Sequence, residues 1–69
     1  MEISYDKEAD ALYITLGDGE FASNRKLDEH TILDLNEKGE VIGIEFLNVS
    51  ERMPEKAFSE VKLKNVMAA

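Results

Sequence analysis

The sequence predicts a mainly β domain of the α+β class: an antiparallel five-stranded meander with a short C-terminal helix and possibly a sixth strand. Three observations support this prediction. Short runs rich in β-branched and aromatic residues recur along the chain, brief turn-forming segments separate them, and helical features begin only near residue 50. No repeat or Pro/Ser-rich linker divides the 69 residues, so we expect one domain over residues 1–69.

Five runs are expected to form the strands, and four short segments are expected to turn the chain between them. The runs are residues 2–5, 11–16, 21–27, 31–35 and 41–47. The turns are residues 6–10, 17–20, 28–30 and 36–40. Each run has the length of an ordinary strand, and the turns are too short to hold a crossover helix, so the strands are expected to be antiparallel.

The register of the last hairpin can be derived from its turn. A type I turn over residues 36–39, with Gly39 at the positive-φ position of a G1 bulge, pairs Leu35 with Val41. Continuing the ladder places apolar side chains on both faces: Ile32, Ile42, Ile44 and Phe46 on one, and Leu33, Leu35, Val41 and Leu47 on the other. A sheet with one face in water should alternate between apolar and polar residues, so we expect a homodimer, formed by a sheet face or by a strand edge.

Glu45 is a charged exception in this pattern. The derived register places it on the face that carries Leu33 and Leu35. An unpaired buried charge is costly, so we expect a salt bridge or hydrogen bond to the Glu45 carboxylate, with Arg25 or Lys26 as its partner.

The C-terminal extension, residues 53–69, carries two competing patterns. Ser50 is expected to cap a short turn through residues 51–53. Pro54 and the acidic residue after it suit the start of a helix, whose apolar contacts would be Ala57, Phe58 and Val61. After Glu60, apolar Val61 and Leu63 alternate with Lys62 and Lys64, which favours a strand. The patterns leave helix and strand open over residues 54–66.

Composition narrows the class of partner and the location. Fifteen acidic and eight basic residues give a net charge of −7, which would repel a phosphate backbone, so nucleic acid is not expected as a partner. No apolar run approaches the roughly 20 residues needed to cross a bilayer. The chain has no cysteine, and its first residues lack the features of a signal peptide, so we expect a cytoplasmic protein without membrane association.

Residues 34–45 nearly match a calcium-binding loop. Asp34, Asn36, Gly39 and Glu45 fall at loop positions one, three, six and twelve. Lys38, however, stands at a ligand position, and strand-like runs flank the segment where the motif requires helices. We interpret the segment as a β-hairpin and predict no metal there.

No other group of residues predicts catalysis. The carboxylate pairs Asp6/Asp10, Asp18/Glu20 and Asp28/Glu29 are expected to be solvated turn residues in similar environments, whereas acid–base catalysis needs carboxyls with different proton affinities. His30 lacks a serine in an activating motif and is expected at the surface or at a strand edge. We therefore predict no catalytic, cofactor-binding or metal-ligating residue and no cofactor. The five aromatic residues are expected to be core and interface anchors.

Two blocks of the sequence resemble the small prokaryotic family called domain of unknown function 2283. The first block matches at Tyr5, Asp6, Ala9, Asp10, Ala11, Leu12, Tyr13 and Ile14. The second matches at Gly39, Gly43, Ile44, Glu45, Leu47 and Ser50, with Val49 where the family more often has Ala. The resemblance covers about residues 3–52. It implies a β-meander with a short helical element, and it implies no site residue, because no activity is established for the family as a whole.

These observations favour a non-enzymatic, cytoplasmic β domain that forms homodimers. One alternative is an antitoxin-like or other partner-binding module whose acidic surface covers a basic protein. The other is a small-molecule or metal-dependent enzyme. The sequence alone does not identify a ligand or a pathway.

Overall fold

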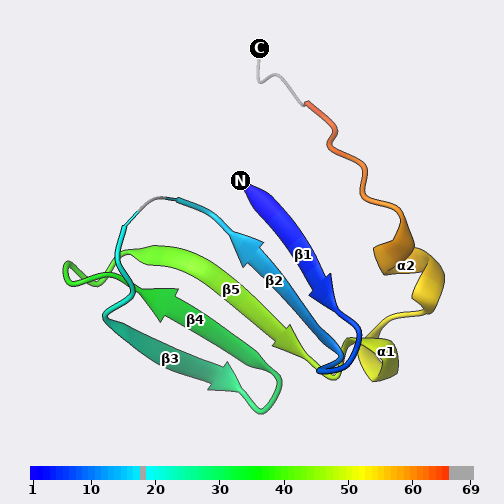
Figure 1. Ribbon diagram of the computed structural model, residues 1–69, viewed down its shortest axis with the longest axis horizontal. Helices are drawn as coiled ribbons and strands as arrows, with labels where there is room; N and C mark the ends of the chain where they lie inside the picture. Colours follow the sequence, from blue (N-terminus) through cyan, green and yellow to red (C-terminus); the bar gives the residue numbers. More distant parts are fainter. Residues whose placement is uncertain (18, 66–69) are drawn as a thin grey trace.

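The computed structural model describes residues 1–17 and 19–65, and its main feature is one five-stranded antiparallel sheet (Figure 1). The strands are β1 (Glu2–Asp6), β2 (Ala11–Thr15), β3 (Ser23–Asp28), β4 (Thr31–Leu35) and β5 (Val41–Leu47). The predicted class, a mainly β domain with five antiparallel strands, is confirmed.

The strand order differs from a simple meander. The order across the sheet is β1-β2-β5-β4-β3, so the last strand lies in the centre, between β2 and β4. The connection from β2 to β3 passes around the ends of β5 and β4 (Figure 1). With seven residues β5 is the longest strand, and it is almost wholly apolar, so the central position gives its backbone and side chains neighbours on both sides.

The turn between β4 and β5 is the predicted one. The Gly39 N–H donates to the Asn36 carbonyl at 3.0 Å, and the Asn36 N–H donates to the Glu40 carbonyl at 3.0 Å. Gly39 has a φ of 80°, which a residue with a side chain rarely adopts. The pairing of Leu35 with Val41 is also confirmed.

Beyond that pair, the derived register is wrong by one residue. Asp34 lies opposite Gly43 and Leu33 lies opposite Ile44, so Ile42 is the extra residue of a β-bulge. A shift of one residue moves every following side chain to the other face of the ladder. The bulge therefore separates apolar from polar side chains, and the expectation that both faces are apolar is wrong.

Residues directly opposite each other on antiparallel strands share a face, so the observed pairs define two faces. The apolar face carries Ile3, Leu12, Ile14, Leu33, Leu35, Val41, Ile44 and Phe46, together with the polar residues Tyr5, Ser23, Arg25, Asp28 and Thr31 toward its edges. The polar face carries Glu2, Ser4, Asp6, Tyr13, Thr15, Asp34, Lys26 and Glu45, together with Ala11, Ile32, Gly43 and Leu47. The four residues Leu33, Leu35, Val41 and Leu47, expected together, are thus split between the faces.

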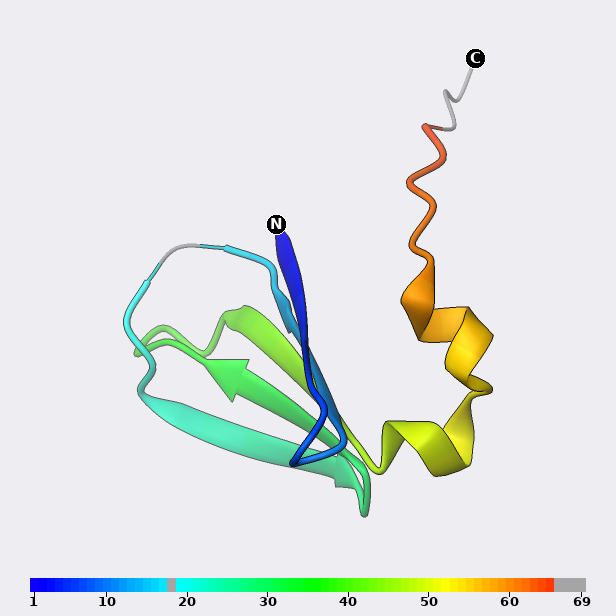
Figure 2. The same ribbon diagram turned by 45° about the vertical axis from the view of Figure 1, so that its right-hand side comes forward.

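Two short helices follow the sheet, α1 (Val49–Arg52) and α2 (Glu55–Ser59), and the described chain ends in an extended segment over residues 60–65. Figure 2 shows the helices and this segment to one side of the sheet, nearest β1. The extensive contacts between elements are those of neighbouring strands. In the described chain Ile42 and Val49 are the buried apolar residues, so the sheet is a single layer without a deep core.

Both helix and strand were open for residues 54–66, and the structure gives a different answer for each part of this range, with residue 66 outside the described residues. Residues 55–59 are helical, and residues 60–65 are extended without a strand partner in the described chain. The side chain of Phe58, an expected helix contact, lies outside what is described. The predicted cap is wrong: Ser50 lies inside α1, whose N-cap is Asn48 with a φ of 53°. No described helix is long and apolar enough to span a bilayer.

Candidate functional site

The polar face holds a cluster of three side chains from three adjacent strands: Tyr13 on β2, Glu45 on β5 and Asp34 on β4. The Tyr13 hydroxyl donates a hydrogen bond of 2.6 Å to Asp34 Oδ2. Tyr13 lies directly opposite Glu45, and Asp34 lies opposite Gly43, so the tyrosine ring leans along the sheet and crosses β5 to reach Asp34.

Gly43 provides the space for this crossing. A Cβ atom at position 43 would overlap the Tyr13 hydroxyl oxygen and lie 2.9 Å from Tyr13 Cζ. Glycine in a strand interior often marks a site where another group approaches the backbone closely, and here that group is the tyrosine ring. The position of the Tyr13 hydroxyl therefore depends on the missing side chain of Gly43.

The carboxyl groups of Asp34 and Glu45 form a pair inside this cluster. Asp34 is only 5% exposed, and its Oδ1 atom has no hydrogen-bond donor among the described groups when both carboxyls are ionised. Burial raises the pKa of Glu45, and so do its hydrogen bond with Asp34 and the Asp34 charge. A protonated Glu45 can donate a hydrogen bond to the Asp34 carboxylate, which explains why two acids are tolerated side by side.

Tyr13 shares this environment. Its hydrogen bond to Asp34 raises the pKa of Tyr13 to about 12, with burial and the charges of Asp34 and Glu45 adding to the effect. The hydroxyl therefore stays protonated at neutral pH and acts as a hydrogen-bond donor. The arrangement can hold a proton between two carboxyls and bind three strands together.

The expected location and partner of Glu45 are both wrong. The bulge places Glu45 on the polar face beside Asp34, and not beside Leu33 and Leu35. Lys26 lies opposite Ile32, which in turn lies opposite Glu45, so two strand spacings of about 4.8 Å each separate Lys26 from Glu45. Arg25 lies opposite Leu33, on the other face.

Asp10 forms a second polar cluster at the β1–β2 turn. Its carboxylate accepts hydrogen bonds from the Ser50 hydroxyl at 2.6 Å, the Ser50 N–H at 3.0 Å and the Tyr5 hydroxyl at 2.9 Å. The hydrogen bond from the Ser50 side chain is the main reason that the pKa of Asp10 is lowered. These contacts bind the turn to α1. Asp10 therefore anchors the helix and is not a freely solvated turn residue.

The other expected carboxylate pairs have separate roles. Asp6 accepts hydrogen bonds from the Glu8 and Ala9 N–H groups within its own turn, as expected of a turn residue. Asp28 accepts from the His30 N–H at 2.8 Å, and this bond lowers the pKa of Asp28. In the pair Asp18/Glu20, Asp18 lies outside the described residues.

His30 is a half-buried residue in the β3–β4 turn. Its ring Nδ1 lies 3.0 Å from Asn48 Nδ2, so the asparagine amide donates and the imidazole nitrogen accepts. Its carbonyl accepts from the Leu47 N–H at 2.8 Å and from Arg52 at 3.0 Å. The Asp28 carboxylate binds the His30 backbone, so these contacts hold the turn against the chain that follows β5.

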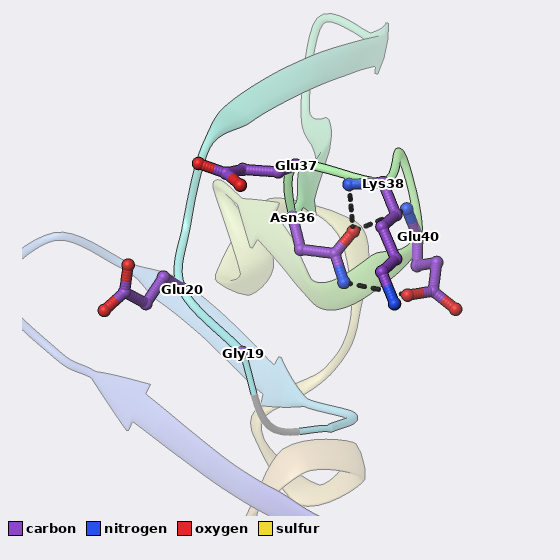
Figure 3. A pocket seen from close by; sticks show the side chains of 6 residues that line it. All are labelled: Gly19, Glu20, Asn36, Glu37, Lys38 and Glu40. Carbon is purple, nitrogen blue, oxygen red and sulfur yellow. Dashed lines mark hydrogen bonds between the residues drawn. The ribbon is translucent and has the colours of Figure 1, made fainter.

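The calcium-like loop is the β4–β5 hairpin, as interpreted from the sequence (Figure 3). Asn36 Oδ1 accepts from the Lys38 and Glu40 N–H groups at 3.0 and 2.9 Å, and Asn36 Nδ2 donates to Glu40 at 3.0 Å. Its polar atoms are therefore used to close the turn. The hollow beside it is lined by Gly19, Glu20, Asn36, Glu37, Lys38 and Glu40. Over the described residues, no group of three or more His, Cys, Asp and Glu is placed to hold a metal.

The apolar face is the second candidate site, and its chemistry is that of an interface. A row of four aliphatic side chains crosses four adjacent strands: Ile3, Ile14, Ile44 and Leu33. Ile3, on the outer strand β1, and Val41, at the start of the central strand β5, are 38% and 41% exposed. Arg52 covers another residue of this face, Phe46, with its guanidinium carbon 5.6 Å from the centre of the Phe46 ring.

One protein-family model matches the chain. It is described as "Protein of unknown function (DUF2283)" and matches residues 2–50. Searches of curated proteins and of solved structures found no match. The matched region contains the whole sheet, Gly43 and the polar-face cluster, and it ends inside α1.

Proposed function

For this chain, which belongs to the DUF2283 family of proteins of unknown function, we propose the role of a non-catalytic domain that forms a homodimer through its apolar face. One observation carries the proposal. Eight apolar side chains lie on one face of a single-layer sheet, and the described helices pack at its side and not across it.

The accessible surface supports burial by a second copy. The chain exposes 5702 Å², whereas a compact monomer of 7.8 kDa exposes about 4,400 Å². The excess of about 1,300 Å² is larger than the roughly 800 Å² that each partner buries in an interface of standard size. Part of the excess belongs to the extended C-terminal segment, in which Val61 and Leu63 are 63% and 86% exposed.

The distribution of charge favours the apolar face over the polar one. Two copies of a chain with a charge of −7 repel each other, and contact through the polar face would bring Glu2, Asp34 and Glu45 toward their counterparts. Contact through the apolar face directs these groups away from the partner, and the charged strand residues on that face, Arg25 and Asp28, have opposite signs. Face-to-face packing of two sheets at a distance of about 10 Å would then form a two-layer core.

A basic protein partner is the second candidate. The same net charge of −7 supports it, because an acidic surface accelerates association with a basic one. This candidate uses the charged surface and gives no role to the apolar row. It predicts binding that weakens steeply with salt, whereas the homodimer is expected to persist at high salt.

Substitutions on the apolar face test the homodimer. Ile3→Glu and Val41→Glu each place a charge on this face at a position exposed enough to leave folding intact. Ser4→Glu is the matched control, because Ser4 is exposed and lies on the same strand as Ile3 but belongs to the polar face. Light scattering should show weakening of the dimer by about tenfold or more for the first two variants and no change for the control. An unchanged mass for all three variants would refute the apolar-face interface.

A further inference from the structure

We propose that residues 61–64 of one copy add as a strand to the open edge of β1 in the second copy, which makes the C-terminal segment an exchanged arm. This inference rests on the homodimer proposed above and specifies what holds its two copies together. Three observations support it: the unpaired edge of β1, the alternation of apolar and basic residues in the segment, and the position of the segment relative to the sheet.

β1 is an outer strand of the sheet and pairs with β2 on one side only. An open edge of this kind presents backbone N–H and C=O groups that can accept a further strand. The side chains of β1 alternate: Ile3 belongs to the apolar face, whereas Glu2, Ser4 and Asp6 belong to the polar face. A strand added to this edge should therefore alternate between apolar and basic residues.

Residues 61–64 have this alternation. Val61 and Leu63 are apolar and are 63% and 86% exposed, and Lys62 and Lys64 stand between and after them. The backbone leading into the segment is extended, with φ −136° and ψ 123° at Glu60. Beside β1, Val61 and Leu63 would extend the apolar face, and the two lysines would lie on the polar face near Glu2 and Asp6.

Charge along the chain fits the same pairing. Residues 1–54 hold thirteen acidic and five basic residues, whereas residues 61–64 hold two lysines and no acid. Lys62 has one ionic contact among the described residues, a 3.4 Å pair with Glu60 in which both side chains are largely exposed. Exposed pairs of this kind contribute little, so Lys62 can exchange this partner for an acid on β1.

The position of the segment points to the second copy. A groove of about 590 Å³ separates the segment from its own sheet, with Met1, Ile3 and Ile14 on one side and Val61, Lys62 and Leu63 on the other. Because Ile3 and Ile14 belong to the apolar face, the segment stands on the side where the second sheet would pack.

Engineered disulfides test this exchange, because the chain has no cysteine of its own. Chains carrying Ser4→Cys are mixed with chains carrying Lys62→Cys or Lys64→Cys, and the mixture is oxidised and separated on a denaturing gel. We expect a covalent heterodimer, since all three positions would lie on the polar face of the added strand pair. Lys56→Cys, on α2, replaces the arm variants as a control and should give no such product. If the mixture gives no heterodimer and a single chain with both Ser4→Cys and Lys62→Cys closes on itself, the arm binds its own sheet and the exchange is refuted.

Truncation separates this inference from the homodimer itself. A chain ending at Ser59 should form the dimer about tenfold or more weakly than the full chain, because the strand pairs and lysine contacts of two arms are lost. Lys62→Glu with Lys64→Glu should weaken the dimer at low salt, and Lys56→Glu should not. A truncated chain that dimerises as tightly as the full chain refutes the exchanged arm alone, whereas a full chain that is monomeric refutes the homodimer and the arm together.

Discussion

The hydroxyl of Tyr13 on β2 bonds to the carboxylate of Asp34 on β4 at 2.6 Å, across the full width of β5. The two side chains and the hydrogen bond between them together bridge two strand spacings, about 10 Å between backbones, and this is possible because Gly43 has no side chain in the path of the ring. The bond joins the three inner strands on the polar face. We therefore regard the cluster as an arrangement that fixes the sheet, while the opposite face carries the proposed homodimer interface.

Tyr13→Phe should destabilise the fold by about 1–3 kcal/mol, because it leaves the buried Asp34 carboxylate without its tyrosine donor. Urea unfolding at one fixed protein concentration measures the loss. Tyr5→Phe is the control, since the carboxylate that Tyr5 contacts keeps its donors from Ser50. An equal effect of both substitutions would contradict the importance given to the buried pair.

Gly43→Ala should be strongly destabilising, by roughly 2–4 kcal/mol, because the new methyl group would occupy the path of the Tyr13 ring. The test is a double-mutant cycle with Tyr13→Ala, which removes the ring. In that background Gly43→Ala should cost much less. If the two effects simply add, the ring and the glycine are not coupled as described.

Glu45 should make stability fall as the pH rises. Its folded-state pKa is raised above the ordinary value of 4.5, chiefly by burial, so the folded chain binds this proton more tightly than the unfolded chain does. That contribution is complete below pH 4.5 and is lost as the pH rises through the raised pKa. Glu45→Gln should remove this part of the pH dependence, as measured by thermal unfolding at a series of pH values. A Glu45→Gln profile parallel to that of the unsubstituted chain would contradict the shared proton.

The contribution of Asp10 to folding stability should have the opposite pH dependence, and it should appear at lower pH. Its lowered pKa gives a contribution that is present above the ordinary value of 3.8 and lost as the pH falls through the lowered value. Asp10→Ala should lower the melting temperature more than Asp10→Asn, because asparagine tolerates the positive φ of 52° at this position. Hydrogen exchange at the Ser50 amide should accelerate in both variants, and an unchanged rate would show that the turn does not anchor α1.

The sequence was sufficient for the strands and for the closing hairpin turn. Alternating apolar runs and the position of Gly39 locate them to within one or two residues, because these signals are local. The family could also be identified from two short blocks, and the match over residues 2–50 agrees with the expected range of 3–52.

The bulge at Ile42 is the feature that sequence reasoning missed, and most other errors follow from it. Apolar residues are so frequent in β5 that both registers are acceptable locally, and the choice between them depends on long-range partners such as Tyr13 and Asp34. Gly43 is the residue from which the bulge could have been predicted, since a glycine inside a strand often marks a bulge or a place where another group approaches the backbone closely. The central position of β5 was missed for the same reason, because pairing with β2 is not a local property.

Sedimentation equilibrium of the full chain at micromolar concentration tests the central claim most directly. The account predicts a mass of twice 7.8 kDa that persists at high salt, where contacts between apolar faces are retained. A mass of 7.8 kDa over the whole concentration range would contradict it, since the apolar row from Ile3 to Leu33 would then face water in the native protein.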